Sequence, residues 1–519
     1  MSRSPSCRQH SALGRKVITC AATLCLCFAA ATAHAIEPVT YYGFDPDSYS
    51  ETAQDGLQKI FAGKLFQMAI PSGAARIVFS SAAGTQKAAG FEPGSAEALF
   101  YTFGRLPSPP TRTSGGDPGF GIGESVFERD GASFVNINCF ACHAGVVNGQ
   151  VVAGLGNNHI NQSDLKQART RGDNFGPYEV WRLGARLSDP EKRGLVLANS
   201  KTDLQKLIES LPLPPVDPMP WWLMKYKRLN YWYADGGSDS AANFSINFTT
   251  PHGQLNARRA EHVEVVAKAL AFARETQSPL FPGSLDGDLV RQGADLFHGR
   301  TPPVVATGFR ACKTCHGTYT NKPEHGDLSQ PGSWNVDYNF SDVLRNVHTD
   351  TSYNATLQQL KPIADNINKL AVYFADQGTP ELIPHASVPD KEGYVAPPLV
   401  GVWASAPYFH NGSAPTIEAV LNSAIRPEIW ARDNRDPHAY DLEKVGMKFR
   451  PVSRDECDAS AAAAEGKSFL SKATVEHGTI YDTKQSGHGN MGHTFGDRLS
   501  AAERLAIIEF LKSLSGPDM

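Results

Sequence analysis

The sequence predicts a mainly α-helical protein of two domains connected by long irregular loops. Three observations predict this fold. A five-residue cysteine and histidine motif occurs twice, far apart along the chain, so each copy belongs to its own folding unit. Apolar residues recur at helical spacing before the second motif and near the end of the chain. Glycine (46) and proline (35) interrupt the 519 residues often, so the helices should be short.

The repeated motif is Cys-x-x-Cys-His, at Cys139–His143 and again at Cys312–His316. Two thiols about one helical turn apart can add to the two vinyl groups of a haem, while the adjacent imidazole binds the iron. A thioredoxin-like redox pair, or one zinc site shared by the four cysteines, would leave both histidines unexplained. We therefore expect two covalently bound c-type haems.

The haem-attaching residues follow from the same spacing. They are Cys139, Cys142, Cys312 and Cys315 as the thiols, with His143 and His316 as the iron ligands.

The first 35 residues have the composition of a secretory signal peptide. Arg3, Arg8, Arg15 and Lys16 precede an apolar run over 17–33, and Ala33-His34-Ala35 is a cleavage site. The run is too short to predict a membrane span. Covalent haem attachment also belongs to exported proteins, so we expect a periplasmic or secreted protein with a mature chain that begins at Ile36.

Charge and length limit the remaining possibilities. The formal net charge is −4, and removal of the cationic signal makes it more negative, which argues against a nucleic-acid partner. A chain of this length divides into two or three domains. The segment 277–288 has the composition of a linker, so we expect an N-terminal haem domain over 36–285 and a C-terminal one over 286–519.

The end of the chain carries the clearest helix signal. Ser500 and Glu503 form a capping box, in which each side chain bonds a backbone N–H of the other residue. The apolar stripe that follows consists of Leu505, Ile508, Leu511 and Leu514. A second helix should lead into the second haem motif, with its apolar side at Leu289, Gly293, Leu296 and Phe297.

A faint internal repeat follows each motif. An aromatic cluster with a tight turn at Gly236 lies nearly as far past His143 as the turn at Gly412 lies past His316. Matching the two glycines places Ala234 where the second half has His410. Either the two domains are related but carry different side chains at this loop, or two common aromatic turns lie at similar distances by chance.

The segment 406–421, Ala-Pro-Tyr-Phe-His-Asn-Gly-Ser-Ala-Pro-Thr-Ile-Glu-Ala-Val-Leu, resembles the bacterial di-haem cytochrome c peroxidase superfamily. Tyr481-Asp482 and the sequence Gly-Asn-Met-Gly-His-Thr-Phe-Gly over 489–496 look most like its rubber-oxygenase-type branch. The resemblance covers 285–519 well and the first half poorly. The first half looks expanded. It implies two cytochrome c-like haem domains with insertions.

The resemblance also implies functions. Peroxidases of this superfamily use one haem to accept electrons and another, with an open iron face, to reduce hydrogen peroxide. The rubber-oxygenase-type branch cleaves carbon–carbon double bonds with dioxygen. Relatives can also hold a calcium ion between their lobes, which the sequence leaves open.

One departure concerns the sixth ligand of the electron-handling haem. Peroxidases have a methionine shortly after the Pro-Tyr-Phe-His motif, and amine-modifying relatives have a tyrosine, but 411–424 contains neither. The resemblance to the rubber-oxygenase branch points to His493 instead. The alternatives are Met447, Met491 and His488, or a surface role for His493. For His410 the resemblance implies a place near the haems, against the alternative of a histidine bonded to local backbone.

The first haem is the candidate for catalysis. An enzyme needs an open iron face, and the loop that matches His410 offers only Ala234. The nearest imidazole after His143 is His159. Acid–base residues opposite His143 are not identified. The tryptophans 221, 222 and 232 could form an aromatic relay, a substrate wall or ordinary core.

Three functions remain. The first is an exported peroxidase-type di-haem oxidoreductase, in which one haem activates peroxide or dioxygen and the other transfers or tunes electrons. It would draw electrons from a small cytochrome or a cupredoxin. The second is a di-haem dioxygenase acting on an apolar unsaturated hydrocarbon or lipid. The third is an electron carrier without catalysis, for which the chain is larger than needed.

The haem count gives the first test. Intact mass and a haem-stained denaturing gel of the mature protein should show two haem additions on a chain that begins at Ile36. Replacing Cys312 and Cys315 with alanine should remove one of them, because the thioether bonds are lost. A mass with a single haem, or with bound zinc, would contradict the assignment of the two motifs.

Overall fold

The structure is a computed structural model of the chain. It describes residues 39–159, 214–359, 391–464 and 480–516. Short gaps fall at 64, 66–69, 81–86, 88–91, 96–97, 99–104, 117–119, 231, 233–234, 238–240, 242–258, 304–308, 323–326, 333 and 433–435. The predicted signal peptide, residues 1–35, lies outside the described residues.

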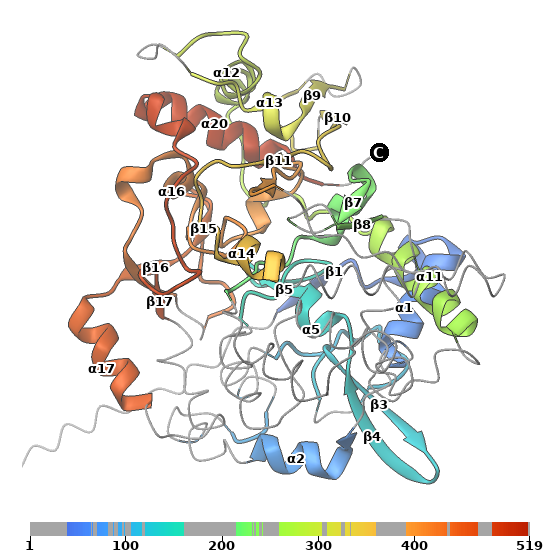
Figure 1. Cartoon of the computed structure of the whole chain (residues 1–519). Coiled ribbons are helices and arrows are strands. Elements are labelled where there is room, and N and C mark those ends of the chain that lie inside the picture. The colour runs from blue at the N-terminus through green and yellow to red at the C-terminus, as the bar shows by residue number, and fades with distance from the viewer. Residues whose placement is uncertain are drawn as a thin grey trace, which may run out of the picture.

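The N-terminal half combines short strands with two main helices, coloured blue to green in Figure 1. Its elements are β1 (Thr40–Tyr42), η1 (Pro46–Ser48), α1 (Glu51–Phe61), β2 (Ile70–Pro71), α2 (Ser72–Ser80), β3 (Glu124–Arg129), β4 (Ala132–Ile137), α5 (Phe140–His143), β5 (Ala144–Val147), β6 (Gln150–Ala153), η2 (Trp221–Tyr226), β7 (Leu229–Asn230), β8 (Asp235–Gly237) and α11 (Arg259–Glu275).

The C-terminal half, coloured yellow to red, begins with α12. Its elements are α12 (Gly287–His298), α13 (Lys313–His316), β9 (Thr318–Asn321), β10 (Trp334–Asp337), β11 (Leu344–Arg345), α14 (Ser352–Gln359), β12 (Tyr394–Val395), η4 (Val402–Ala404), α16 (Ile417–Leu421), η5 (Ser423–Ile425), β13 (Ile429–Arg432), β14 (Tyr440–Asp441), β15 (Gly446–Met447), β16 (Phe449–Pro451), α17 (Arg454–Ala464), β17 (Ile480–Asp482), η6 (Phe495–Arg498) and α20 (Ala501–Ser513).

Each half is closed by a pair of helices that cross at a glycine. In the first half α1 packs on α11, and a Cβ on Gly56 would lie 2.0 Å from the Lys268 carbonyl oxygen. In the second half α12 packs on α20, side by side at the top of Figure 1, and a Cβ on Gly293 would lie 1.9 Å from the Ala506 carbonyl oxygen. In both halves the order is glycine-bearing helix, Cys-x-x-Cys-His turn, closing helix.

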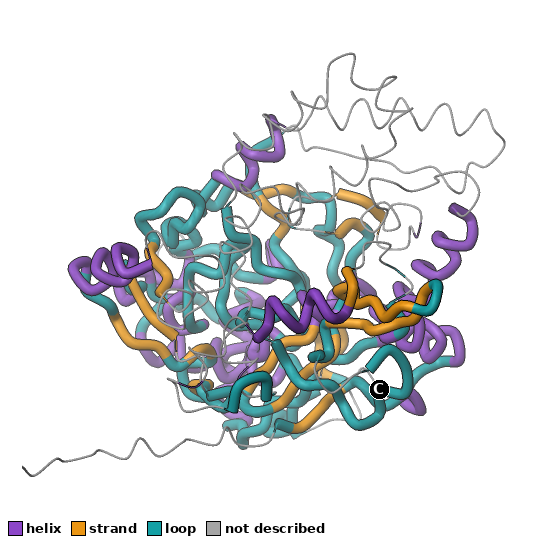
Figure 2. The backbone as a smooth tube through the Cα atoms, turned by 90° about the horizontal axis from the view of Figure 1, so that it is seen from below, coloured by secondary structure: helices purple, strands orange, loops and turns teal. Residues whose placement is uncertain are grey.

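The prediction of a mainly α-helical protein is wrong. The described residues form seven small sheets of two or three strands each. Figure 2 shows these strands and the loops forming most of the tube between the helices. Buried loops must pair their backbone N–H and C=O groups, and short strand pairs do so. Most of these strands have only two to four residues, too few for a detectable periodicity, while the six-residue β3 and β4 were missed in the sequence analysis.

The helical predictions in the second half were better. The capping box of Ser500 and Glu503 is confirmed, and α20 begins directly after Ser500. The helix before the second motif is confirmed as α12, which ends at Gly299 in the left-handed conformation. One member of the predicted apolar stripe differs, because Leu505 is 48% exposed while Ile507 and Phe510 are buried in its place.

Two hydrophobic cores lie side by side. The N-terminal core gathers α1, α11 and Phe140, whereas the C-terminal core gathers α12, α20 and the segments around Trp403 and Trp430. The β5–β6 hairpin contributes to both, because Val146 and Val151 face the first core while Val147 and Val152 face the second. Within the described residues no helix is both long and apolar enough to cross a bilayer.

The helix crossing in the C-terminal half gives a stability prediction. Gly293→Ala should lower the free energy of unfolding by about 1–3 kcal/mol, because the added methyl group overlaps the backbone of α20. Denaturant unfolding measures the loss. The control is Gly73→Ala in α2, where a Cβ meets nothing within 4 Å and the change should be neutral or stabilising. Equal effects of the two variants would contradict the close helix crossing.

Candidate functional site

Both haem motifs fold as a single helical turn. Cys139 precedes α5 and Cys312 precedes α13, and each has helical backbone angles. The backbone N–H of His143 donates to the Cys139 carbonyl, and that of His316 donates to the Cys312 carbonyl, both at 3.0 Å. The two thiols and the imidazole of each motif are therefore held by one turn of helix.

A cavity of about 220 Å³ opens beside the second motif, against the ~15 Å³ that one water molecule needs. Cys312, Cys315, His316 and His493 all line it. The rest of its wall is mostly apolar and includes Leu223, Val347, Val395, Leu399, Leu421, Leu499 and Leu511. Such a chamber suits a large flat apolar group with thiols and an imidazole at its edge.

His316 and His493 both line this cavity and lie close together. Their ring centroids are 6.2 Å apart and the ring planes differ by 71°. Two imidazoles that bind one metal from opposite sides have centroids roughly 6 Å apart, because each metal–nitrogen bond is about 2 Å long. The residues present therefore fit a haem iron between them.

The surroundings of both imidazoles favour their neutral form. Nδ1–H of His316 donates to the Pro397 carbonyl at 2.8 Å, which leaves Nε2 as the lone-pair nitrogen. Burial lowers the pKa of His493 to about 3, helped by His316 and Arg426. Burial also lowers the pKa of His316. A metal binds the neutral imidazole, so neither ring has to lose a proton at neutral pH.

The other candidate sixth ligands lie elsewhere. Met491 is 64% exposed, and Met447 is buried beside a different cavity. His488 packs on Tyr481, and its Nδ1 lies 3.0 Å from the Ser486 carbonyl. None of these three lines the cavity around His316.

Arg345 adds a polar group to the cavity wall. Its Nη2 donates to the Thr314 carbonyl at 2.8 Å, while its buried Nε has no hydrogen-bond partner in the described structure. A haem carries propionate carboxylates, and an arginine is a strong partner for them. The unpaired Nε–H is thus a second observation that fits a haem in this chamber.

His410 also lines the cavity. Its ring stacks on Tyr394 with centroids 3.8 Å apart, and its Nε2 is buried without a hydrogen-bond partner in the described structure. Burial lowers the pKa of His410 to about 4. Its carbonyl accepts from the N–H of Asp217, whose carboxyl also lines the cavity and has a pKa raised well above its usual range by burial. The expected place near the haem fits this geometry better than a histidine bonded to local backbone.

At the first motif the structure describes the histidine and both cysteines. His143 stacks on Trp221 with centroids 5.0 Å apart, and burial lowers its pKa to about 4. Burial raises the pKa of Cys139 to about 12 and that of Cys142 to about 11. Ala234, the residue matched to His410, lies outside the described residues.

The three tryptophans occupy different places. Trp221 belongs to the N-terminal core beside His143, whereas its neighbour Trp222 belongs to the C-terminal core and donates to the Val400 carbonyl at 2.9 Å. Trp232 lines the cavity of the second motif, and its Nε1 donates to the Asp217 carbonyl. All three are packed, and the adjacent Trp221 and Trp222 belong to different hydrophobic cores.

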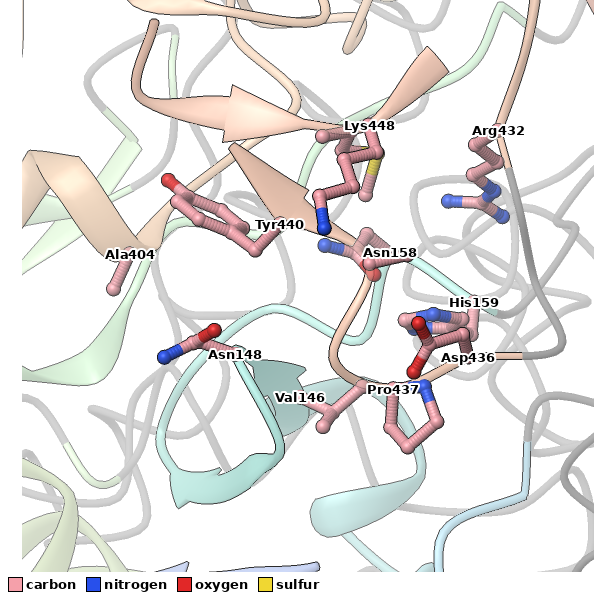
Figure 3. A pocket seen from close by; sticks show the side chains of 12 residues that line it. Val146, Asn148, Asn158, His159, Ala404, Arg432, Asp436, Pro437, Tyr440 and Lys448 are labelled. Carbon is pink, nitrogen blue, oxygen red and sulfur yellow. The ribbon is translucent and has the colours of Figure 1, made fainter. Parts of the chain in front are cut away.

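His159 lies in a second, small cavity of about 20 Å³, shown in Figure 3. Arg432, Lys448 and Asp436 surround it, and Asn158 donates to the Ala406 carbonyl at 2.6 Å. This cavity lies between the β5–β6 hairpin and the strands β13 to β15. It has room for about one water molecule, so His159 lines a polar contact between the halves.

No other metal cage appears in the described part of the chain. There, no three His, Cys, Asp or Glu side chains converge into a group that could hold a metal ion. The calcium ion of relatives stays a prediction.

The sequence analysis missed several residues of the site, namely the wall residues Asp217, Arg345, Tyr394 and Pro397, and Arg426 behind the His493 loop. They come from separate segments and form no motif. One available signal was Pro397-Pro398: neither proline has an N–H to donate, so this stretch does not form a regular sheet ladder and its carbonyls can accept from side chains.

Comparison with known proteins supports the haem assignment. Residues 393–431 match a family described as "RoxA-like, cytochrome c-like". This segment supplies Tyr394, Pro397, His410 and Arg426, all at or beside the cavity of the second motif. The chain thus carries a segment similar to RoxA-like cytochromes c beside its second Cys-x-x-Cys-His turn, and this similarity supports a haem-containing cytochrome.

Two curated relatives come from Sinorhizobium fredii (strain NBRC 101917 / NGR234). "Uncharacterized protein y4iM" is 38% identical over 113 residues, 22% of this chain and 22% of the relative. "Uncharacterized protein y4iJ" is 27% identical over 274 residues, 45% of this chain and 40% of the relative. The chain therefore spans less than half the length of either relative.

Acid stability tests the burial of His410. Its pKa is about 4 in the folded protein and about 6.5 in the unfolded chain, so only the unfolded state takes up this proton between those values. The stabilisation is complete above pH 6.5 and is lost as the pH falls toward 4. Between pH 7 and pH 4 the parent should lose about 3 kcal/mol more than His410→Phe, as measured by denaturant unfolding. Equal losses of stability in the parent and in His410→Phe over this pH range would show that His410 is hydrated in the folded protein.

Proposed function

We propose that the protein is an exported di-haem c-type oxidoreductase with one closed and one open haem. The haem attached to Cys312 and Cys315 is closed by His316 and His493. The haem attached to Cys139 and Cys142 is bound by His143 and carries out catalysis. The 6.2 Å separation of the His316 and His493 rings is the observation that supports this division.

The closed haem suits electron storage and transfer. A six-coordinate iron reorganises little when its charge changes, and two imidazoles give a lower potential than an imidazole and a thioether. The apolar wall and the hydrogen bond from His316 to Pro397 fix the ring and exclude water. Arg345 would hold a propionate, and burial of Asp217 raises the pKa of its carboxyl, which disfavours a negative charge in the cavity wall.

The open haem would activate dioxygen or peroxide opposite His143. When bound, haem iron supplies the redox chemistry of O–O bond activation. Trp221 packs on His143, and Trp222 lies in the core of the closed haem, so these adjacent rings are candidates for an electron relay between the two sites. Oxidation of a small cytochrome or cupredoxin would supply electrons in a peroxidase reaction.

A second candidate function is a dioxygenase that cleaves an apolar unsaturated hydrocarbon or lipid. The observation that favours it is the match of residues 393–431 to the RoxA-like family, in the wall of the closed haem. Such a reaction uses both oxygen atoms of O2 and needs no continuous donor. Oxygen uptake by the reduced protein with polyisoprene or an unsaturated fatty acid, in the absence of donor, would select this function. Peroxide-dependent oxidation of a reduced cytochrome would select the peroxidase.

The ligand assignment gives a direct prediction. His493→Ala should convert one haem from low-spin to high-spin and raise its potential, because one imidazole is lost from the iron. The other haem should keep its affinity for carbon monoxide nearly unchanged. Optical spectra and redox titration measure both effects. Met491→Ala is the matched control in the same loop, since that side chain points to solvent and should leave both haems as they were.

If the His493→Ala variant keeps a fully low-spin spectrum, His493 is not a ligand of the haem iron. The division into a closed and an open haem would then lose its main support.

A further inference from the structure

Arg426 joins the loop that carries His493 to the end of helix α16. Its Nη1 donates to the carbonyls of Asn490 at 2.8 Å and Gly492 at 2.7 Å, and its Nη2 donates to that of His493 at 3.1 Å. On the other side, Nε donates to the Ala419 carbonyl at 2.9 Å and Nη2 to the Val420 carbonyl at 3.0 Å. One guanidinium thus ties five carbonyl groups from two segments.

The backbone of His493 needs such support. Its φ is +44°, in the left-handed region that a non-glycine residue enters only at a cost. Its N–H donates to the Val347 carbonyl at 2.8 Å, and the preceding Gly492, with φ +75°, leaves no space for a Cβ beside His348. A strained backbone of this kind persists only when its surroundings hold it.

The side chain of His493 offers no support of its own. Its Nδ1 is buried and makes no hydrogen bond to another residue in the described structure, unlike Nδ1 of His316, which bonds to Pro397. Metal-binding histidines are normally oriented through the nitrogen that does not bind the metal. For His493 this fixing bond is missing, so the ring must be oriented through its backbone and its neighbours.

We propose that Arg426 is the positioning residue that keeps His493 directed at the closed haem. The inference rests on the proposed function, since it needs His493 as an iron ligand. Arg426 holds the carbonyls of residues 490, 492 and 493, and its guanidinium also lies 5.0 Å from the ring centre of Phe409. Phe409 in turn packs against the His493 ring at 5.9 Å between centroids. Arg426 therefore fixes both the backbone and one wall of the imidazole.

Only arginine can make this set of contacts. Guanidinium has five N–H donors in a planar fork, while lysine has three donors on one nitrogen and glutamine has two. Part of the guanidinium's hydration is lost, and the pKa of Arg426 is lowered by burial, although nearby Asp497 opposes that shift. The acceptors at Ala419 and Val420 belong to the C-terminal end of α16, where the helix dipole favours a cation.

The test uses the haem-loaded protein and the spectrum of the closed haem. Arg426→Gln should bring a high-spin component into this haem and open it to carbon monoxide, with His493 bound about 10- to 100-fold more weakly. Arg504→Gln is the matched control, because Arg504 donates to the carbonyls of Gly496 and Leu499, just past the His493 loop, and the closed haem should stay low-spin. If Arg426→Gln does not accumulate with both haems, Arg426→Lys takes its place, with a smaller shift of the same kind.

His493→Ala separates the two possible failures. If it opens the closed haem while the Arg426 variants stay fully low-spin and reject carbon monoxide, Arg426 only stabilises the fold and the inference is overturned. A lower melting temperature without a spectral change has the same meaning. If His493→Ala leaves the haem low-spin, the ligand assignment itself is wrong.

Discussion

Two buried imidazoles that line one apolar cavity impose the constraint on which the C-terminal half depends. A separation of 6.2 Å between His316 and His493 requires two distant segments to meet at a fixed spacing. One partner is fixed by a helical turn and the Pro397 carbonyl. The other lies on a loop held by Arg426, Val347 and the close contact of Gly492 with His348. The long loops around the cavity therefore hold the two histidines in place, in addition to connecting the helices and strands.

The two halves share a construction but differ in their surroundings. A glycine in the first helix of each half lets a closing helix approach to backbone contact, at Gly56 with α11 and at Gly293 with α20. The haem-motif turn lies between these helices in sequence in both halves. Trp221 and Trp222 then place adjacent aromatic rings in the two cores. The arrangement is consistent with the proposed pair of haem sites, one in each half.

Local signals in the sequence were sufficient for some features. The Cys-x-x-Cys-His spacing locates both turns, and the capping box at Ser500 locates α20, because each depends only on neighbouring residues. The short strands and the left-handed His493 backbone depend on contacts between distant segments, which no local pattern encodes. Arg426 was missed for this reason, since its five acceptors come from residues 419–420 and 490–493.

The most direct test of the account is the electron paramagnetic resonance spectrum of the oxidised wild-type protein. One closed and one open haem predict a low-spin signal typical of two imidazole ligands together with a high-spin signal, and only the high-spin component should change when cyanide is added. Two low-spin signals that cyanide leaves unchanged, with no carbon monoxide binding after reduction, would contradict the account. Both irons would then be closed, and electron transfer without catalysis would explain the protein better.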